Sequence, residues 1–396
     1  MRRLLLSLVP SLVVGSGAAV AGFTDTWTRL GVPVGASNFG DLNVILVAAQ
    51  CAHDDPAWSA ATPPCVAGMD YYNYPSLWAK AFGIFGANPS WTSSVAVALT
   101  VLFVVALFPL TWYALGTRPT WGRTLVMTLV AVLPPTWLAF QRGNIDQGVF
   151  ALIVLSAVLW ISGLAVAPGI AVGVAATLKI FPIGSALMLL NRSSGRRSAL
   201  VSLISTGIVG ILLIARDLPT ISARTPQIDG ASFGIGLLPL LAANRLNLAA
   251  GVTTARLVGA AVFIAVTVLL IIMIRSTAAS TPTRAWRELC EGLSADHVAS
   301  SLVLAGGGAF LVAYLLGPSY DYRLIFLLPV IAGLLRLASR AANVAVSILI
   351  AQFLLSYSTY VGAAEYLSDL MLLVVAPLML ITAWFVVRPS RRMVTA

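Results

Sequence analysis

Residues 91–115 read WTSSVAVALTVLFVVALFPLTWYAL, a run without a single charged side chain. About 20 apolar residues in a helix are enough to cross the roughly 30 Å hydrocarbon core of a bilayer. This stretch therefore predicts a membrane-spanning helix, and similar runs recur along the chain. The protein has 396 residues, of which 59% are hydrophobic and 10% charged, and its mean hydropathy is +0.93. Soluble domains carry about 25% charged residues, so we expect lipid to be the solvent of this chain.

Further apolar segments predict an all-α polytopic membrane protein with about twelve crossings. The other single spans are expected at 4–22, 124–140, 147–161, 199–215, 255–274, 301–316, 324–337, 344–357 and 370–387. Residues 162–190 are expected to form two short half-helices that turn at 179–182, because Pro182 removes a backbone donor. One continuous span there would carry the arginines of 191–197 to the outer side, against the positive-inside rule.

The formal charge of +10 comes mainly from arginines in the short segments between apolar runs. The positive-inside rule explains this pattern and places both termini in the cytoplasm, so nucleic acid is not an expected partner. The long segment 23–90 then lies outside, with short interfacial helices, and a surface helix is expected within 275–299. We divide the chain into a catalytic module, 1–200, and a variable C-terminal module, 201–396.

Several cations lie where this topology predicts few of them. Arg142, Lys179 and Arg323 fall on or near the external face, and ionisable groups at membrane depth are expensive and usually functional. Interfacial side chains that snorkel and pair with neighbouring acids are the alternative interpretation. Lys179 stands in an otherwise apolar run, so its ammonium needs an anion, and a phosphate at the membrane surface would supply one.

The long external segment contains the candidate carboxylates and a dense aromatic stretch. Asp41 begins an apolar run that can lie as a helix on the membrane surface, where it is a candidate catalytic group or an ordinary helix cap. The stretch DYYNYPSLW at 70–78 is either an interfacial aromatic belt or a platform for a sugar. Cys51 and Cys65 share this segment, and the sequence leaves open whether they form a disulfide or two free thiols.

A series of short motifs is similar to a known enzyme family. They are Asp41 after the first span, the YNYP element at 72–75, QRGNID at 141–146, LKIFP at 178–182 and, more weakly, SYDYRL at 319–324. In this order they resemble the GT-C membrane glycosyltransferases, specifically glycosyltransferase family 87, the polyprenyl-phosphate-mannose-dependent α-mannosyltransferase type. The resemblance covers about the first half of the chain.

The resemblance implies an inverting transferase that takes a sugar, with mannose favoured, from a polyprenyl-phosphate donor. A glycolipid or polysaccharide would accept it on the periplasmic side of a bacterial inner membrane, among membrane lipids. The family's general base is an aspartate of the first external loop, a place that Asp41 fits. Ile45 stands where an aromatic residue often follows in the family, so Asp54 and Asp55 stay as rival bases.

The same chemistry assigns the remaining candidate residues. Inverting transfer needs a carboxylate to deprotonate the acceptor and cations to stabilise the leaving phosphate. Arg142, Lys179 and Arg323 are the candidates for the phosphate. Contacts to sugar or acceptor are predicted for Tyr72, Asn73, Tyr74, Asn144, Asp146, Tyr320 and Asp321. No cofactor or metal is expected, because fixed cations can hold a monophosphate and no metal-ligand motif such as CxxC or HExxH occurs.

Two other classes of function stay open. A transporter or lipid flippase would need ionisable groups near the middle of several spans, whereas this sequence concentrates them at helix ends on one side. A non-catalytic membrane scaffold would need neither Lys179 in an apolar run nor a long external segment rich in Asp and Tyr.

Overall fold

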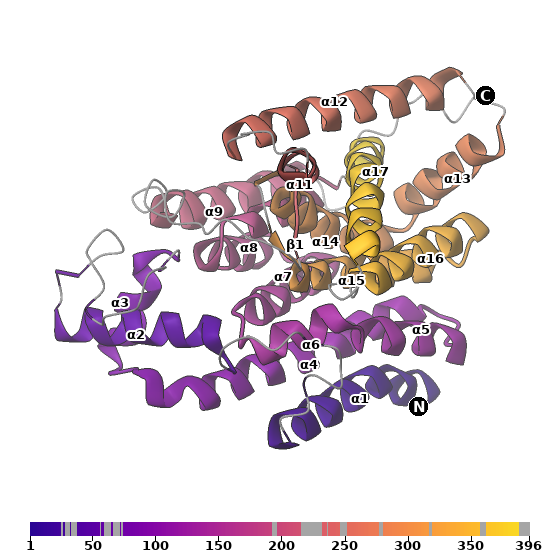
Figure 1. The fold of residues 1–396 in the computed structure, drawn as a ribbon. Helices are drawn as coiled ribbons and strands as arrows, with labels where there is room; N and C mark the ends of the chain where they lie inside the picture. The colour runs from indigo at the N-terminus through magenta and orange to yellow at the C-terminus, as the bar shows by residue number, and fades with distance from the viewer. Residues whose placement is uncertain are drawn as a thin grey trace.

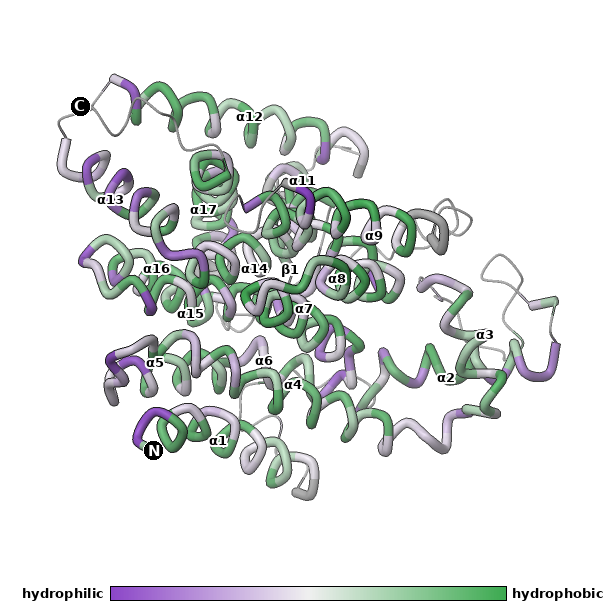
Figure 2. Tube along the Cα trace, turned by 180° about the vertical axis from the view of Figure 1, so that it is seen from behind, coloured by the Kyte–Doolittle hydropathy of each residue, from purple (hydrophilic) through white to green (hydrophobic). Residues whose placement is uncertain are grey.

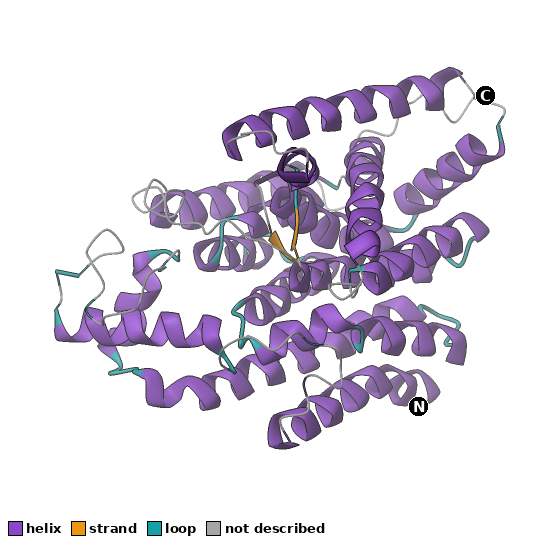
Figure 3. Ribbon diagram, in the orientation of Figure 1, coloured by secondary structure: helices purple, strands orange, loops and turns teal. Residues whose placement is uncertain are grey.

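The structure of the chain is a computed structural model that describes most of its length. The described residues are 1–24, 27, 32, 38–55, 57–58, 65, 72, 74–191, 196–214, 232–235, 237–245, 252–276, 280–316, 319–356 and 362–387. Helices make up nearly all of this part of the chain (Figure 3). Its two strands hold two residues each, β1 (Ser232–Phe233) and β2 (Ser319–Tyr320), and they pair antiparallel.

The helices form one packed bundle (Figure 1). The elements before residue 215 are α1 (Arg2–Thr24), α2 (Gly40–Asp54), α3 (Ser76–Ile84), η2 (Pro89–Trp91), α4 (Thr92–Leu115), α5 (Trp121–Ala131), α6 (Pro134–Gln141), α7 (Asp146–Ile161), α8 (Ala167–Leu178), η3 (Phe181–Leu190) and α9 (Arg196–Ile214). The later elements are α11 (Leu237–Arg245), α12 (Val252–Ser276), α13 (Thr281–Ala295), α14 (His297–Leu316), η5 (Asp321–Leu327), α15 (Leu328–Leu337), α16 (Arg340–Leu355) and α17 (Gly362–Val387).

Five described segments are long and apolar enough to cross a membrane. They are Arg2–Gly22, Pro89–Leu115, Thr253–Ser276, His297–Leu316 and Tyr366–Val387. The span expected at 124–140 is instead a helix pair, α5 and α6, that bends by 44° at the residues before Pro134. The bend fits proline chemistry, because the residue before a proline avoids the helical conformation. The protein is thus an all-α polytopic membrane protein.

The surface of the bundle is apolar in the way that lipid contact requires. In the most hydrophobic stretch of α12 only 11% of the residues are buried. Figure 2 shows this helix at the edge of the bundle, hydrophobic along most of its length. Its exposed side chains include Leu257, Ile264 and Leu269. Since such a face would aggregate in water, α12 is expected to face lipid tails.

Helix α14 is the centre of the bundle, with 78% of its apolar stretch buried. The 3-10 helix η3 runs beside it in the opposite direction: Ser185 Oγ donates to Ala305 O at 2.8 Å and Asn191 Nδ2 to Ser300 Oγ at 2.6 Å. A Cβ on Gly184 would collide with the backbone of α14. η3 belongs to the expected module 1–200 and α14 to the expected module 201–396. Because the two elements pack on each other, the two modules share one core.

The chain breaks at Lys179, as the half-helix prediction requires. α8 ends at Leu178, Lys179 is extended with φ −152° and ψ 148°, and η3 starts at Phe181 with Pro182 in its first turn. Trp78 Nε1 of α3 donates to Thr177 O at 2.7 Å, just before the break. The break therefore lies at the end of the bundle where α2 and α3 project (Figure 1).

Candidate active site

The start of α2 is fastened to the turn between α6 and α7. The backbone N–H of Phe39 donates to Gln141 O at 2.7 Å, and that of Asp41 donates to Arg142 O at 3.2 Å. Phe39 adopts φ 61°, in the left-handed region that a bulky residue rarely enters. These bonds bring Asp41, in the first turn of α2, beside the QRGNID stretch about 100 residues further along the chain.

Asp41 is bound by two side chains of that turn. Arg142 Nη2 lies 2.6 Å from Asp41 Oδ1, and Arg142 Nε lies 3.1 Å from each carboxylate oxygen. Asn144 Nδ2 donates to Asp41 Oδ2. The side chains of Asp41 and Arg142 are 14% and 30% exposed. A ligand approaching from solvent can therefore reach this pair.

A second carboxylate, Asp146, lies deeper and pairs with two more cations. Lys179 Nζ is 2.8 Å from Asp146 Oδ1, and Arg323 Nε is 3.3 Å from Asp146 Oδ2. The Asp146 side chain is 0% exposed, whereas those of Lys179 and Arg323 are 10% and 20% exposed. Asp146 therefore orients the two cations rather than facing a ligand itself, which differs from its predicted contact with sugar or acceptor.

Asn144 joins the two carboxylate groups into one network, here named the polar cluster (Asp41, Arg142, Asn144, Asp146, Lys179, Arg323). Its amide nitrogen donates to Asp41, while its Oδ1 accepts from Lys179 Nζ at 3.1 Å and from the backbone N–H of Asp146 at 2.8 Å. Asn144 is itself fully buried, so it positions its neighbours and does not face a ligand.

Aromatic rings line the cations. Lys179 Nζ lies 5.2 Å from the ring centroid of Tyr74 and 5.8 Å from that of Tyr322. The guanidinium of Arg142 lies 4.8 Å from the ring centroid of Tyr320, which stacks on Tyr322. Rings at such distances attract cations through the negative faces of their π systems. The rings carry no charge, so the carboxylates are the charged partners of these cations.

The polar cluster carries three cations and two carboxylates, so its formal charge is +1. Burial alone would lower the pKa of Arg142, but the hydrogen bonds and charge of Asp41 outweigh it and raise that pKa, so Arg142 stays protonated. Burial, with the charges of Asp41 and Asp146, raises the pKa of Tyr74 well above its usual range. The net charge and the fixed protonation of Arg142 suit an anionic ligand.

The remaining aromatic and acidic candidates lie close to the cluster but are more enclosed. Tyr72 is 2% exposed, packs edge-on against Trp58, and donates from its hydroxyl to Pro75 O at 2.9 Å. This burial leaves Tyr72 as support for Tyr74 rather than as an open sugar platform. Asp321 begins η5 and is 8% exposed. Asn73 lies outside the described residues.

The rival bases lie at the far end of α2. Asp54 is the last residue of that helix and Asp55 follows it, whereas Asp41 stands in the first turn. At 1.5 Å per residue this separates them from Asp41 by roughly 20 Å. Both are exposed, and Asp55 Oδ1 accepts the backbone N–H of Ala57 at 2.9 Å. Neither belongs to the polar cluster.

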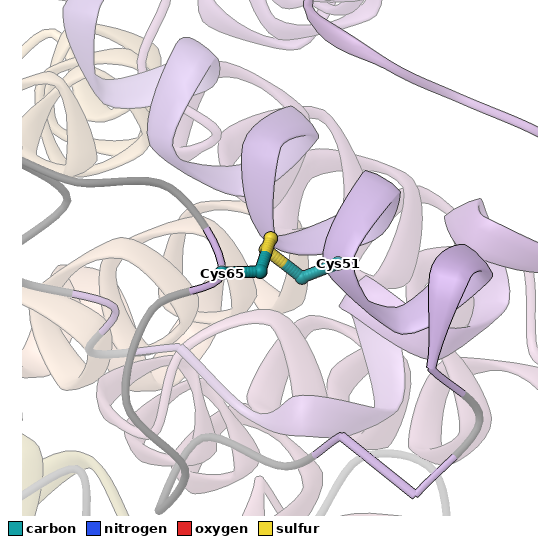
Figure 4. The surroundings of a disulfide bond; sticks show 2 residues. All are labelled: Cys51 and Cys65. Atoms are coloured by element: carbon teal, nitrogen blue, oxygen red, sulfur yellow. A yellow bond between two sulfur atoms is a disulfide. The ribbon is translucent and has the colours of Figure 1, made fainter.

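A disulfide holds the same far end of α2. Cys51, in the last turn of the helix, is bonded to Cys65, with 5.6 Å between the Cα atoms (Figure 4). Of the two possibilities that the sequence left open, the structure has the bridge. Both ends of α2 are thus anchored, the first to the α6–α7 turn and the last to the segment that follows the helix.

Sequence reasoning left three contributors out of the site. Tyr322 and Phe181 lie over Lys179 and Arg323, and Ser319 Oγ accepts from Arg323 Nη1 at 2.6 Å. All three lie inside motifs that the sequence analysis had identified. The predicted site residues beside them in those motifs were the one sequence feature that pointed to them. Among the described residues, no group of three or more His, Cys, Asp or Glu side chains is arranged to hold a metal ion.

Comparison with known proteins adds no relative. A scan against protein-family models, a search of curated proteins and a search of solved structures each returned no match.

Proposed function

We propose that this protein is a membrane-embedded inverting glycosyltransferase of GT-C type. It moves a sugar, with mannose favoured, from a polyprenyl-phosphate donor to a glycolipid or polysaccharide acceptor. One observation carries the proposal: the polar cluster joins a solvent-reachable carboxylate, Asp41, to three cations at one end of an apolar helix bundle. A lipid-linked phosphate would reach such a site from the membrane while an acceptor arrives from water.

The cations have hydrogen-bonding capacity left for a phosphate. Arg142 uses Nε and Nη2 on Asp41, and Arg323 uses Nε on Asp146 and Nη1 on Ser319. Nη1 of Arg142 and Nη2 of Arg323 have no hydrogen-bond acceptor among the described residues. Guanidinium groups bind phosphate oxygens strongly through such donors, and Lys179 between them adds a compact charge.

The reaction assigns a separate task to each charged group. Asp41 accepts the proton of the acceptor hydroxyl as that oxygen bonds to the anomeric carbon of the sugar. The bond from the same carbon to the phosphate oxygen breaks, and its electron pair leaves with the polyprenyl phosphate. Arg142, Lys179 and Arg323 stabilise the negative charge that builds on that phosphate. Fixed cations can do this without a metal, because the leaving group is a monophosphate.

The proposal includes about twelve membrane crossings, with the shorter apolar helices completing the bundle. Those helices are Asp146–Ile161, Ala167–Leu178, Phe181–Leu190, Arg197–Gly210 and Arg340–Leu355. The site faces the periplasm of a bacterial inner membrane. Its end of the bundle carries the disulfide, a bond typical of oxidising compartments. Non-helical backbone at Lys179 is tolerated in a membrane where it lines a cavity rather than lipid.

Turnover of the donor tests the proposal. The purified protein is incubated in detergent with polyprenyl-phosphate mannose, and release of free polyprenyl phosphate is followed with and without an acceptor extract. We expect release by the wild type and a loss of at least about 100-fold in Asp41→Asn, with donor binding retained. Parallel variants Asp54→Asn and Asp55→Asn decide between the rival bases.

Each outcome has a defined meaning. Full activity of Asp41→Asn would remove Asp41 as the base, and loss only in Asp54→Asn or Asp55→Asn would move the role to that residue. If mannose fails, the donors carrying arabinose, glucose and galactose are tried in turn. No release and no binding with any of the four would reject the transferase in favour of the transporter alternative.

A further inference from the structure

Three arginines from distant parts of the chain meet at the C-terminal end of α4. Arg3 of α1 donates from Nε and Nη2 to Trp112 O, at 3.2 and 2.6 Å. Arg123 of α5 donates from Nη1 to Leu115 O at 2.8 Å. Arg336 of α15 donates from Nη1 to the carbonyl of Tyr113, the residue after Trp112, at 3.4 Å. All three arginine residues are only partly buried.

Gly116 leaves the space in which two of these groups approach each other. It ends α4 with φ 58°, and a Cβ placed on it would lie 3.7 Å from Nη1 of Arg123 and 3.7 Å from Nη1 of Arg336. The two cationic groups therefore lie within about 7.5 Å of each other, across one glycine. Like charges held this close repel each other unless an anion joins them.

Protein groups neutralise only part of this charge. Among the described residues one carboxylate pairs with the three arginines, Asp296, whose Oδ2 lies 2.8 Å from Arg336 Nε. The formal charge of this basic cluster (Arg3, Arg123, Arg336, Asp296) is therefore +2. Nη1 of Arg3, Nε and Nη2 of Arg123, and Nη2 of Arg336 have no hydrogen-bond acceptor in the described part of the chain. Several donors of the basic cluster thus lack an acceptor among these residues.

The basic cluster lies at the opposite end of the bundle from the polar cluster. α5 begins beside Arg123, and α6, which continues it, ends next to Arg142. At 1.5 Å per residue the pair spans up to roughly 30 Å, about the thickness of the hydrocarbon core. α4 likewise runs from the α2 side of the bundle to the basic cluster. The two clusters are therefore expected at opposite faces of the membrane.

Apolar side chains flank the basic cluster. Leu5 on α1 is 54% exposed, while Leu125 and Trp121 on α5 are 61% and 57% exposed. α1 and α5 pack on each other, so these exposed apolar side chains belong to two neighbouring helices that also carry Arg3 and Arg123. Acyl chains can cover these side chains while a headgroup stays at the level of the guanidinium groups. A free phosphate ion has no apolar part that could pack against these side chains.

We propose that Arg3, Arg123 and Arg336 bind the phosphodiester headgroup of an anionic membrane lipid, with its acyl chains against α1 and α5. Basic pockets between membrane helices hold such headgroups through charge-assisted hydrogen bonds. The bound lipid would join three segments that are far apart in the chain, the start of α1, the start of α5 and the end of α15. The site is separate from the donor site and does not depend on the proposed transferase activity.

Lipid binding by the full-length protein tests this site. Delipidated protein in detergent is titrated with short-chain phosphatidylglycerol, with phosphatidylcholine of the same chain length and with inorganic phosphate, and binding is read by native mass spectrometry. We expect the wild type to bind phosphatidylglycerol at least about tenfold tighter than phosphatidylcholine. Arg123→Gln should weaken phosphatidylglycerol about tenfold, the effect of losing one charge-assisted hydrogen bond.

Arg340→Gln is the matched control, because Arg340 is an exposed arginine that starts α16, close behind Arg336 in the chain. It should bind phosphatidylglycerol like the wild type. If Arg123→Gln does not fold, Arg3→Gln on α1 takes its place, with a thermal melt without lipid as the check of folding. Equal binding of the two lipids, equal loss in test and control variants, or phosphate binding as tightly as phosphatidylglycerol would overturn the proposal.

Discussion

At the scale of single residues, Arg142 has two binding partners, Asp41 in the structure and the donor phosphate in the proposed reaction. In the structure it binds both oxygens of Asp41, and in the proposed reaction it also binds the donor phosphate. A phosphate that draws Arg142 towards itself would weaken the hold on Asp41 and leave that carboxylate freer to accept a proton. Donor binding and activation of the base would then be linked through one guanidinium.

Asn144 offers a sharper test at this scale, because each end of its amide does a different job. Asn144→Asp keeps an oxygen to accept the backbone N–H of Asp146, but it replaces the donor to Asp41 with a second negative charge. Because two carboxylates this close repel each other in a buried site, we expect the variant to fold with a lower melting temperature and to lose roughly 10- to 100-fold in kcat. The pH profile of kcat should also shift, because the carboxylate of Asp41 meets a new neighbour.

Asn144→Ala serves as the comparison, since it removes both interactions and should also lower the melting temperature. A wild-type pH profile in Asn144→Asp, with normal turnover, would mean that Asn144 only accepts the backbone N–H of Asp146 at the start of α7.

At the scale of elements, the closest contact of the bundle joins η3 and α14. Gly308→Ala would drive a methyl group into the backbone of Gly184, whereas a Cβ on the neighbouring Gly307 would meet Val330 at an ordinary 3.7 Å. We expect Gly308→Ala to destabilise the protein by about 1–3 kcal/mol or more, and Gly307→Ala to change stability little. Thermal unfolding in one detergent measures both, and equal melting temperatures would contradict this packing.

Helix α13 contains a buried cysteine, Cys290, whose thiol is expected to be unreactive. Cys290 is 2% exposed, and burial raises the pKa of its thiol to about 12. Because the thiolate is the reactive form, native protein should resist alkylation even at pH 9, where an exposed cysteine ionises. Counting by mass spectrometry should give no modified cysteine in the native protein, one after denaturation and three after reduction. A second thiol reacting before reduction would show that Cys51 and Cys65 are not bridged.

At the scale of the whole molecule, charge is sorted to the two ends of an apolar bundle. The polar cluster pairs carboxylates with cations at the α2 end, and the basic cluster carries excess positive charge at the other end. By the positive-inside rule the basic end belongs in the cytoplasm, which leaves the polar cluster outside. The site and the orientation of the protein are therefore linked predictions.

Single cysteines at the two ends of one span test this orientation. Ser90 and Thr117 are both exposed and flank α4. We expect a membrane-impermeant maleimide to label Ser90→Cys on intact cells or spheroplasts and Thr117→Cys only after permeabilisation. Unlabelled wild type is the control for the native cysteines. The reverse pattern would place the polar cluster in the cytoplasm and rule out a periplasmic transferase.

The amino-acid sequence by itself determined the solvent and the class of the protein. Runs such as 91–115 have no stable place in water, so an all-α membrane bundle followed from the length and number of these apolar runs. The helix break at Lys179 could also be predicted from the sequence, because a lysine and a proline within an apolar run disfavour a continuous helix. Such local features do not depend on what the rest of the chain does.

Only the tertiary structure decided which candidates meet and in what role. Asp41 and Arg142 are about 100 residues apart, and the anchoring of α2 at its first turn decides that Asp41, and not Asp54, meets Arg142. The burial of Asp146, likewise, depends on Arg323 arriving from η5. Charge pairing acts over a few ångströms in space, and the bundle alone brings these distant segments within that reach.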